Sequence, residues 1–502
     1  MKQVMWKPER KLIDCQHERV SLPSDSIQTH LFGPCYYCQD CGTWLSDDPA
    51  KRRALRERLS SPGAIPYVVP PAAVLNFEGW RISMAADPPT PVKTGVDEIR
   101  RAVKETQGLD LPVSGVDASG PSILIGTPEH HSIRRLISGG YLTLPDGWPG
   151  YDGFIAAYLR KRDGLDETMA VIGGNPRGVL YGCLEVARLI RRGELTTRAY
   201  VMERPQFKYR GGYAEGENNY RLEEMSITGY FPTEEELKGL AAQRLNVLML
   251  RYNLWRNRHV RYKYLPFVTG APPWLDDEIA GLQRDLALAK KYGFISLVHF
   301  GVSHQSWADA QIFAAYPDAA AARLDDSALY TTFRHICPSH PLLKEYLDAE
   351  IREMAELYPE LDGFVTFCGY DGASLGCDCD KCREYPYSQR LVDYHRFVHD
   401  RLKAYLPHAI MIAEMSSLDM YWRKLAAELP EDVLFTTWSR VPSTLLYPYV
   451  HAEDEMEKEL GPRYLTQLSS HSEGLVNSTV PVVNLEGLQA DIRRAAGRRV
   501  AG

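Results

Sequence analysis

The chain has 502 residues, of which 44% are hydrophobic and 25% are charged, and its formal net charge is -7 at pH 7. This length predicts two or three domains, and this composition is typical of globular proteins with a sizeable core. The negative charge argues against a nucleic-acid partner, and no apolar run is long enough for a signal peptide or a membrane span. We therefore expect a cytoplasmic protein with no membrane partner, whose ten cysteines are reduced or bind metal.

The first segment, residues 1–60, contains two short cysteine motifs, "CQH" and "CQDCG". Together they form a CxH…CxxCG pattern, which is typical of a small zinc ribbon, and Cys35 could replace a ligand at either end. A segment this short has little core of its own, so structural zinc would supply its folding free energy. The ligands that we expect in this zinc-ribbon-like segment are Cys15, His17, Cys38 and Cys41.

The second segment, residues 65–203, alternates signals for strands and helices. "GVDEIRRAVKETQG" has apolar residues at helical spacing and a final glycine that ends a helix. "PSILIG", "YDGFIAAYLRK" and "TMAVIGG" predict strands, and "PRGVLYGCLEVARLIRRG" predicts a buried helix. The segment is therefore expected to be a small α/β accessory domain.

The third segment, residues 204–502, has apolar runs separated by amphipathic helices, one of them with a capping box at Thr233 and Glu236. The runs are "KYRGGYAEG", "LNVLMLRYN", "FISLVHFG", "GFVTFCGY", "AIMIAEMSS", "VLFTTWSR" and "RYLTQLSS", with weaker candidates at "VPVVNL" and "RRVAG". Such alternation is typical of parallel strands covered on both faces, and seven or eight units predict a (β/α)₈ TIM barrel. A doubly wound sheet is the alternative, but no glycine-rich phosphate loop follows the first strand. If "RRVAG" is the eighth strand, we expect a barrel that is incomplete at the C-terminus.

Catalytic residues of such barrels lie at the carboxyl ends of the strands and in the loops that follow them. Asp371 is the first catalytic candidate, because it follows the fourth strand directly and precedes a glycine. Glu414 is the second, because its carboxylate ends an apolar strand, where burial is costly unless it faces a polar mouth or a partner. Carboxylates and aromatic rings at one mouth are what sugar chemistry requires. The other catalytic candidates are Glu473 and Glu486, and the substrate-binding candidates are Arg210, Glu215, His299, His304, Tyr370 and Trp438.

A second group of cysteines follows the fourth strand. Cys377, Cys379 and Cys382 are spaced closely enough to share one tetrahedral zinc ion. A buried knuckle of reduced, hydrogen-bonded cysteines is the alternative, and a catalytic cysteine is disfavoured because no thiol stands beside a defined base. The candidates for the fourth ligand are Cys337, Cys368, His335 and His340, with Cys337 placed first.

Residues 75–200 resemble the small α/β domain that precedes the barrel in family-20 β-N-acetylhexosaminidases and related α-glucuronidases. The pieces that carry this resemblance are "VDEIRRAVKETQG", "ILIGTP" and "VIGGNPRGVLYGCLEVARLI". "ERPQFKYRGGY" resembles the entry to their catalytic barrel, where the arginine of the first strand binds sugar hydroxyls, and the resemblance implies that role for Arg210. "ICPSHP" and "LDGFVTFCGYDGASLGCDCDKC" resemble relatives with a cysteine-rich loop after strand four, so the likeness extends over residues 65–500.

The chain departs from this family at the catalytic pair. Family-20 enzymes carry an Asp-Glu pair after strand four, whereas this chain has Tyr370-Asp371-Gly372, and the glutamate of the α-glucuronidase pattern is also missing. The resemblance implies a hydrolase that cleaves a glycosidic bond in a carbohydrate substrate and needs no organic cofactor. Because the family's pair is absent, the catalytic pair expected from position is Asp371 with Glu414, Glu473 or Glu486. Two alternatives are a non-catalytic carbohydrate-binding protein on a degenerate hydrolase scaffold, and a metal-dependent enzyme that uses the Cys/His clusters. The sequence does not indicate an oligomeric state.

Overall fold

The structure is a computed structural model of the whole chain, and it divides into two compact units, Met1–Gln206 and Phe207–Gly502. The residues that it describes are 72–115, 120–145, 148, 150–162, 164–213, 231–250, 260–301, 307–322, 335–367, 375–415, 421–436 and 450–465, with the short pieces 20–21, 36–38, 44–45, 493, 497–498 and 500–501.

The first segment contributes a small antiparallel sheet of three strands in the order β1-β2-β3. These strands are β1 (Val20–Ser21), β2 (Tyr36–Cys38) and β3 (Trp44–Leu45). Of the expected zinc ligands, Cys15, His17 and Cys41 lie outside the described residues, and only the main chain of Cys38 is described. The zinc ribbon therefore stays a prediction.

The larger sheet of the first unit has six strands. They are β4 (Arg81–Ser83), β5 (Val113–Ser114), β6 (Ser122–Gly126), β7 (Phe154–Leu159), β8 (Thr168–Gly173) and β9 (Tyr200–Glu203). Their order is β5-β4-β6-β8-β7-β9, in which β7 runs antiparallel to both of its neighbours and the remaining pairs are parallel. The strands predicted from "PSILIG", "YDGFIAAYLRK" and "TMAVIGG" are confirmed as β6, β7 and β8.

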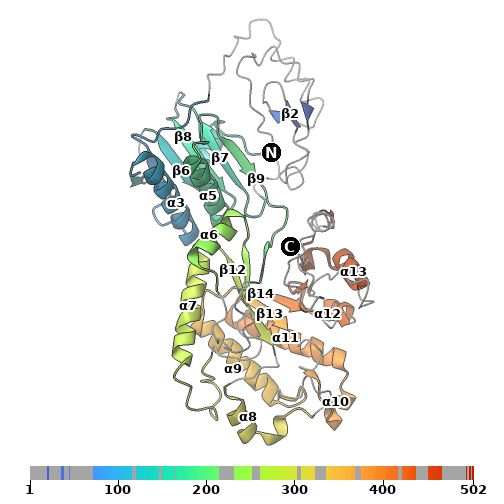
Figure 1. Ribbon diagram of the computed structural model, residues 1–502. Helices are drawn as coiled ribbons and strands as arrows, with labels where there is room; N and C mark the ends of the chain where they lie inside the picture. Colours follow the sequence, from blue (N-terminus) through green and yellow to red (C-terminus); the bar gives the residue numbers. More distant parts are fainter. Residues whose placement is uncertain are drawn as a thin grey trace, which may run out of the picture. The chain divides into compact units, whose positions relative to one another are not determined.

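Two long helices pack together on one face of this sheet, α3 (Thr90–Gln107) and α5 (Pro176–Arg191) (Figure 1). Both are confirmed where the sequence predicts helices, and α3 ends at Gly108, whose φ of 70° is in the left-handed region that favours glycine. Gly182 of α5 lies so close to β8 that an added Cβ would be 2.8 Å from Cγ1 of Val171. The small residue therefore allows the helix to approach the sheet closely.

The shorter helix α4 (His131–Ser138) covers the other face. Its Ile133 and Leu136 join a buried cluster with Ala170 and Ile172 of β8. Side chains two residues apart on a strand share a face, so these residues lie opposite the α5 side of β8. The first unit is therefore an α/β layer domain with helices on both faces.

The second unit is built on a parallel sheet of seven strands that follow one another in sequence order. They are β10 (Gly211–Tyr213), β11 (Val247–Leu250), β12 (Ile295–Gly301), β13 (Gly363–Phe367), β14 (Ile410–Glu414), β15 (Leu434–Thr436) and β16 (Tyr464–Leu465). Each lies within one of the seven apolar runs that predict strands. The mixed α/β class with a parallel sheet is confirmed.

The two edges of this sheet meet at Ala501. Its N–H donates to the carbonyl of Tyr464 in β16 at 2.9 Å, and its carbonyl accepts from the N–H of Tyr209, which precedes β10, at 3.0 Å. Ala501 belongs to the weaker strand candidate "RRVAG", whereas "VPVVNL" lies outside the described residues. The main chain at Ala501 thus takes the place expected of an eighth strand, and the curled sheet fits the expected barrel.

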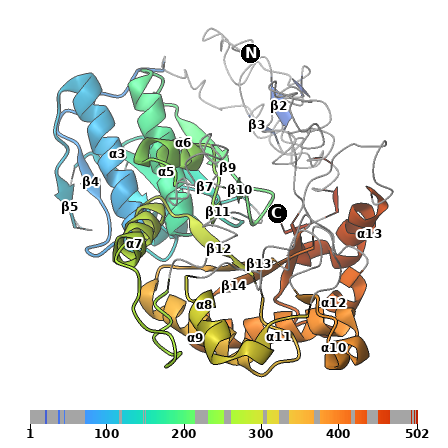
Figure 2. The ribbon, with the colours of Figure 1, turned by 60° about the horizontal axis from the view of Figure 1, so that its bottom comes forward.

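Helices follow most of these strands. The capping box at the start of α6 (Glu234–Ala242) is confirmed, since Oγ1 of Thr233 accepts from the N–H of Glu236 while the N–H of Thr233 donates to the Glu236 carboxylate. In Figure 2 the helices labelled α9, α11 and α12 form an arc beside β13 and β14. The α-helices are α6 (Glu234–Ala242), α7 (Leu275–Lys291), α8 (Asp309–Ala315), α9 (Leu342–Leu357), α10 (Asp380–Glu384), α11 (Tyr387–Tyr405), α12 (Trp422–Glu428) and α13 (Val450–Leu460), and η3 (Pro317–Ala319) and η6 (Gly461–Arg463) are 3-10 turns. Within the described part of the chain, none of the helices combines the length and the apolarity needed to cross a membrane.

Candidate functional site

The concave face of the curled sheet is lined by an apolar core. Val247 of β11, Leu465 of β16 and Ala501 belong to one buried cluster, which also holds side chains of the strands between them. Residues of β11, β16 and Ala501, which lie towards opposite edges of the sheet, can share a cluster only on the inside of the curl. The inward-facing positions of β11 to β16 are therefore known.

His299 and Glu414 face this interior at the carboxyl ends of their strands. On β12 the inward residues Ile295 and Leu297 are followed after two positions by His299, and on β14 Ile412 is followed in the same way by Glu414. His299 Nε2 lies 3.5 Å from Glu414 Oε2, and the two side chains are 2% and 0% exposed. The pair connects β12 and β14 past the intervening strand β13, which is possible only across the concave face.

The strand register places Glu414 in the outermost layer of the described interior. Glu414 is level with Phe367 of β13 and with Thr436 of β15, and Phe367 is level with Gly301 of β12. His299 is level with Val365, one layer lower. The carboxylate thus lies at the end of the barrel where catalytic groups are presented.

Thr436 is a polar neighbour of Glu414 that the sequence analysis did not select. It shares a face with the inward Leu434, is 4% exposed, and donates its hydroxyl to the carbonyl of Leu465 at 3.0 Å. Its signal in the sequence was its place two residues after Leu434 in the apolar run "VLFTTWSR".

Arg210 lies in a different place from the one that the sequence analysis expected. It immediately precedes β10, at the end where the strands begin, and not at their carboxyl ends. Its Nε donates to the carbonyl of Arg244 at 2.7 Å and its Nη1 to that of Phe207 at 2.6 Å. The guanidinium therefore links main-chain segments around the start of β10, and the implied role in binding sugar hydroxyls gains no support from this position.

The remaining sugar-site candidates are not described. Those outside the described residues are Asp371, Glu473, Glu486, Glu215, His304, Tyr370 and Trp438. Their roles stay predictions.

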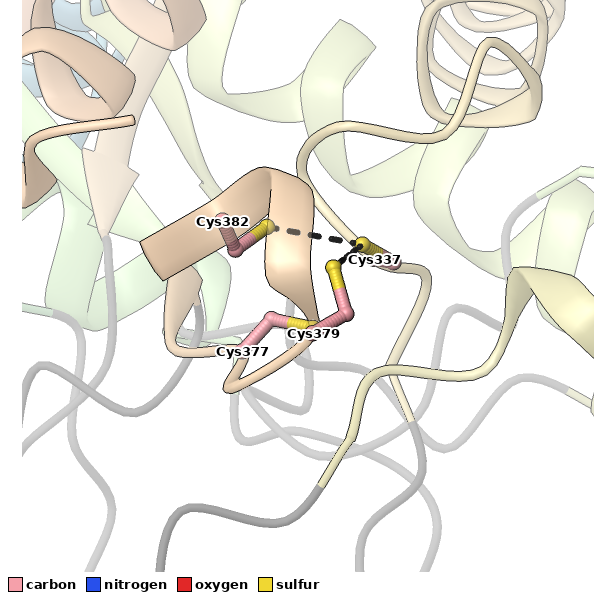
Figure 3. A group of neighbouring side chains, drawn as sticks. All are labelled: Cys337, Cys377, Cys379 and Cys382. Atoms are coloured by element: carbon pink, nitrogen blue, oxygen red, sulfur yellow. Dashed lines mark hydrogen bonds between the residues drawn. The ribbon is translucent and has the colours of Figure 1, made fainter. Parts of the chain in front are cut away.

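A second constellation lies outside the sheet and joins the four cysteines Cys337, Cys377, Cys379 and Cys382. The four Sγ atoms all lie within 4.8 Å of one another. Figure 3 shows the sulfurs of Cys379 and Cys382 directed towards that of Cys337, at distances of 3.7 and 3.6 Å. The sequence left the fourth position of this cluster open, and the structure brings Cys337 into it.

Two main-chain hydrogen bonds and one imidazole contact hold the segments that carry these cysteines. Cys337 donates its N–H to the carbonyl of Ala319 at 2.7 Å, and Asp378 donates to the carbonyl of Ala322 at 3.3 Å. His335 Nε2 lies 2.6 Å from the carbonyl oxygen of Gly376. Three stretches of chain that are distant in sequence are therefore joined around the sulfurs.

The cysteine thiols differ in acidity because their surroundings differ. A hydrogen bond from the backbone N–H of Cys382 lowers the pKa of Cys379 to about 6. Burial raises the pKa of Cys377 to about 12 and raises that of Cys382 as well. The hydroxyl of Ser339, which the sequence analysis missed, lies 3.2 Å from Sγ of Cys337 and 3.3 Å from Sγ of Cys382. Its signal was its position two residues after Cys337 in "CPSHP".

Comparison with known proteins returns glycoside hydrolases of several families among the solved structures. A family-138 enzyme targeting pectin rhamnogalacturonan II gives a TM-score of 0.48 at 14% identity, over 71% of this chain and 38% of its own. An exo-β-N-acetylglucosaminidase of family 20 from Vibrio harveyi gives 0.48 at 13% identity, over 78% of this chain and 57% of its own. The Streptomyces plicatus β-hexosaminidase gives 0.47 at 13% identity, over 82% of this chain and 75% of its own.

No protein-family model matches the sequence, and no curated protein matches it. The chain spans 38% and 57% of the length of the first two structures above. At these identities and TM-scores the likeness assigns neither a reaction nor a substrate to this chain.

Proposed function

We propose that the second unit is a glycoside hydrolase built on a (β/α)₈ barrel, with Glu414 as one of its catalytic carboxylates. The observation that carries this proposal is the buried His299–Glu414 pair at the carboxyl ends of β12 and β14. A buried ionisable pair typically contributes less to stability than apolar side chains of the same size would. Its position above an apolar interior, at the end where barrels present their chemistry, therefore favours a chemical role.

The second carboxylate in this proposal is Asp371. It follows the end of β13 at Phe367 by four residues, and β13 is the strand between those of His299 and Glu414. Carboxyl groups that follow adjacent parallel strands emerge at the same edge of the sheet, which favours Asp371 over Glu473 and Glu486 as the partner of Glu414. One carboxyl group would protonate the leaving oxygen of a glycoside, and the other would act as nucleophile or activate water.

His299 acts through Glu414 in this scheme and is a positioning residue. An imidazole 3.5 Å from the carboxylate restricts its orientation and interacts directly with its charge. Loss of the imidazole should therefore move the pH profile of the reaction as well as its rate.

A metal-dependent reaction at the cysteine cluster is disfavoured. Four thiolates complete the coordination of a tetrahedral zinc ion, whereas a catalytic zinc needs an open position for water or substrate. The carbohydrate-binding alternative makes a different prediction: a sugar would raise the melting temperature of the wild-type chain without being cleaved.

The test is turnover of a panel of aryl glycosides and oligosaccharides by the purified chain. Glu414→Gln and Asp371→Asn should each lower kcat by about 10²- to 10⁴-fold, the usual contribution of a positioned acid or base. His299→Gln should lower kcat and shift the pH profile of kcat/KM.

The matched control is Glu353→Gln. Glu353 is also 0% exposed, but it lies on α9 and accepts the backbone N–H groups of Arg261 and Lys263 at 2.8 and 3.0 Å. This variant should lose stability and keep its kcat per folded molecule. Full activity of Glu414→Gln would remove that carboxylate from the mechanism, and an equal loss in Glu353→Gln would show that burial alone explains the effect.

A further inference from the structure

We propose that Cys337, Cys377, Cys379 and Cys382 form a closed structural zinc site. The four sulfurs come from two separate segments, and each could supply one ligand atom to the same ion (Figure 3). Four thiolates are a common ligand set of structural zinc sites.

The separations of the sulfurs fit a shared ion. With zinc–sulfur bonds of about 2.3 Å, a tetrahedron places its sulfurs about 3.8 Å apart. Cys337 Sγ lies 3.6 Å from Cys382 Sγ and 3.7 Å from Cys379 Sγ. A disulfide would need about 2.0 Å, so none of these measured pairs is one.

The surroundings supply the donors that thiolate ligands need. The N–H of Ala322 donates to Sγ of Cys377 at 3.2 Å, and the hydroxyl of Ser339 lies within 3.7 Å of three of the four sulfurs. Such outer contacts orient ligands and offset their negative charge. Neutral thiols are weak donors and weak acceptors, so four of them facing one another would gain little from the same arrangement.

The other candidates for the fourth position are held elsewhere or are not described. His335 Nε2 contacts the carbonyl of Gly376, and Nδ1 of His340 accepts the N–H of Leu342 at 3.2 Å. Nε2 of His340 lies 3.5 Å from a carboxylate oxygen of Asp318. Cys368 lies outside the described residues. The geometry therefore favours Cys337.

The zinc site would join the segment that follows β13 in the sequence to the segment that precedes α9. Cys377 is the first ligand after β13 in the sequence, and Cys337 lies just before α9, so an ion would join the approach to one helix with the return from β13. Because all four coordination positions are filled by protein, the ion would stabilise this junction and take no part in turnover.

The test is the metal content of the full chain, measured by plasma mass spectrometry. All variants carry Cys38→Ser and Cys41→Ser, which remove the N-terminal candidate zinc site; this double variant is the background chain. This background should retain one zinc ion per chain, and Cys337→Ser or Cys379→Ser added to it should retain none. Cys183→Ser is the control, because Cys183 is a buried cysteine of α5 in the first unit and is not a member of the cluster, and it should keep the zinc.

A second measurement covers variants that fail to fold. Replacing the metal of the background chain with cobalt should produce the absorption of tetrahedral cobalt with thiolate charge transfer. Chelation should lower the melting temperature and speed amide exchange in α10 more than in α3. A background chain without metal, iron in place of zinc, a disulfide among the four cysteines, or unchanged zinc in folded Cys379→Ser would overturn the proposal.

Discussion

Replacing Asp152 with asparagine should destabilise the first unit by about 3–5 kcal/mol, the usual cost of breaking a buried ion pair by removing one partner. The Asp152 side chain is 0% exposed and that of Arg177 is 15% exposed. The Asp152 carboxylate accepts from Arg177 Nη1 at 3.1 and 3.3 Å and from the Asn175 amide at 2.8 Å. In the variant, the Arg177 charge faces a neutral amide in the same buried place.

Burial is the largest single effect on the pKa of Arg177 and lowers it, but the Asp152 carboxylate, together with Tyr181 and Tyr151, makes the net shift upward. Asparagine isolates this charge effect, because Asp152 has a φ of 60°, in the left-handed region that asparagine also tolerates. Asp152→Ala should cost roughly 1–2 kcal/mol more for the backbone. In a unit of this size, 1 kcal/mol shifts the melting temperature by about 2–4 °C, so Asp152→Asn should lower it by about 6–20 °C.

The assay is urea and thermal unfolding of the full chain, with amide exchange in α5 and α11 to locate the effect in the first unit. The control is Asp87→Asn. Asp87 also forms an ion pair, with Oδ1 3.2 Å from Nζ of Lys93, but its side chain is 97% exposed. Its loss should change the unfolding free energy by less than about 1 kcal/mol. Equal effects of Asp152→Asn and Asp87→Asn, or unchanged exchange in α5, would refute the reasoning.

Three further predictions concern pH, glycines and closure of the sheet. Burial lowers the pKa of His395 from 6.5 to about 4, so the unfolded state binds a proton more readily than the folded state does. The unfolding free energy should therefore fall by up to about 3 kcal/mol as the pH drops from 6.5 through 4. His395→Leu should flatten that part of the stability curve measured by urea unfolding. Gly239→Ala in α6 should stabilise the chain by about 0.5–1 kcal/mol, because the added Cβ meets no atom within 4 Å. Gly178→Ala in α5 should instead lower the melting temperature, because the added Cβ would lie 2.4 Å from a backbone oxygen. Ala501→Pro removes the N–H that donates to Tyr464 and should cost about 1–3 kcal/mol in the same unfolding assay, while Ala501→Ser should cost less.

The strands of the second unit could be predicted because their signals are local. A parallel strand covered on both faces is a continuous apolar run, and β11 to β14 are such runs bounded by polar or glycine-containing stretches. The same is true of α5, whose apolar positions and N-terminal Asn-Pro mark a buried helix. Periodicity and turn residues are enough for such elements.

The closing strand and the fourth cysteine depend on distant parts of the chain. "RRVAG" has the same local pattern as many surface segments, and only its hydrogen bonds to Tyr464 and Tyr209 give it a place in the sheet. Cys337 is separated from Cys377 by all of α9 and all of β13. No spacing rule selects it over His335 or His340, because ligand choice is decided by the folded path of the backbone.

The pairing of His299 with Glu414 combines both kinds of information. Alternation along a strand predicts that each side chain faces the interior once its buried neighbours are known, but it does not predict that they meet across β13. That contact depends on the curl of the sheet and on Gly301, which is level with Glu414 and contributes no side chain to its layer. The imidazole one layer lower is therefore the side chain of β12 that reaches the carboxylate. The buried pairing with His299, which strand alternation alone does not predict, is therefore what makes Glu414 a stronger catalytic candidate than its strand alone indicated.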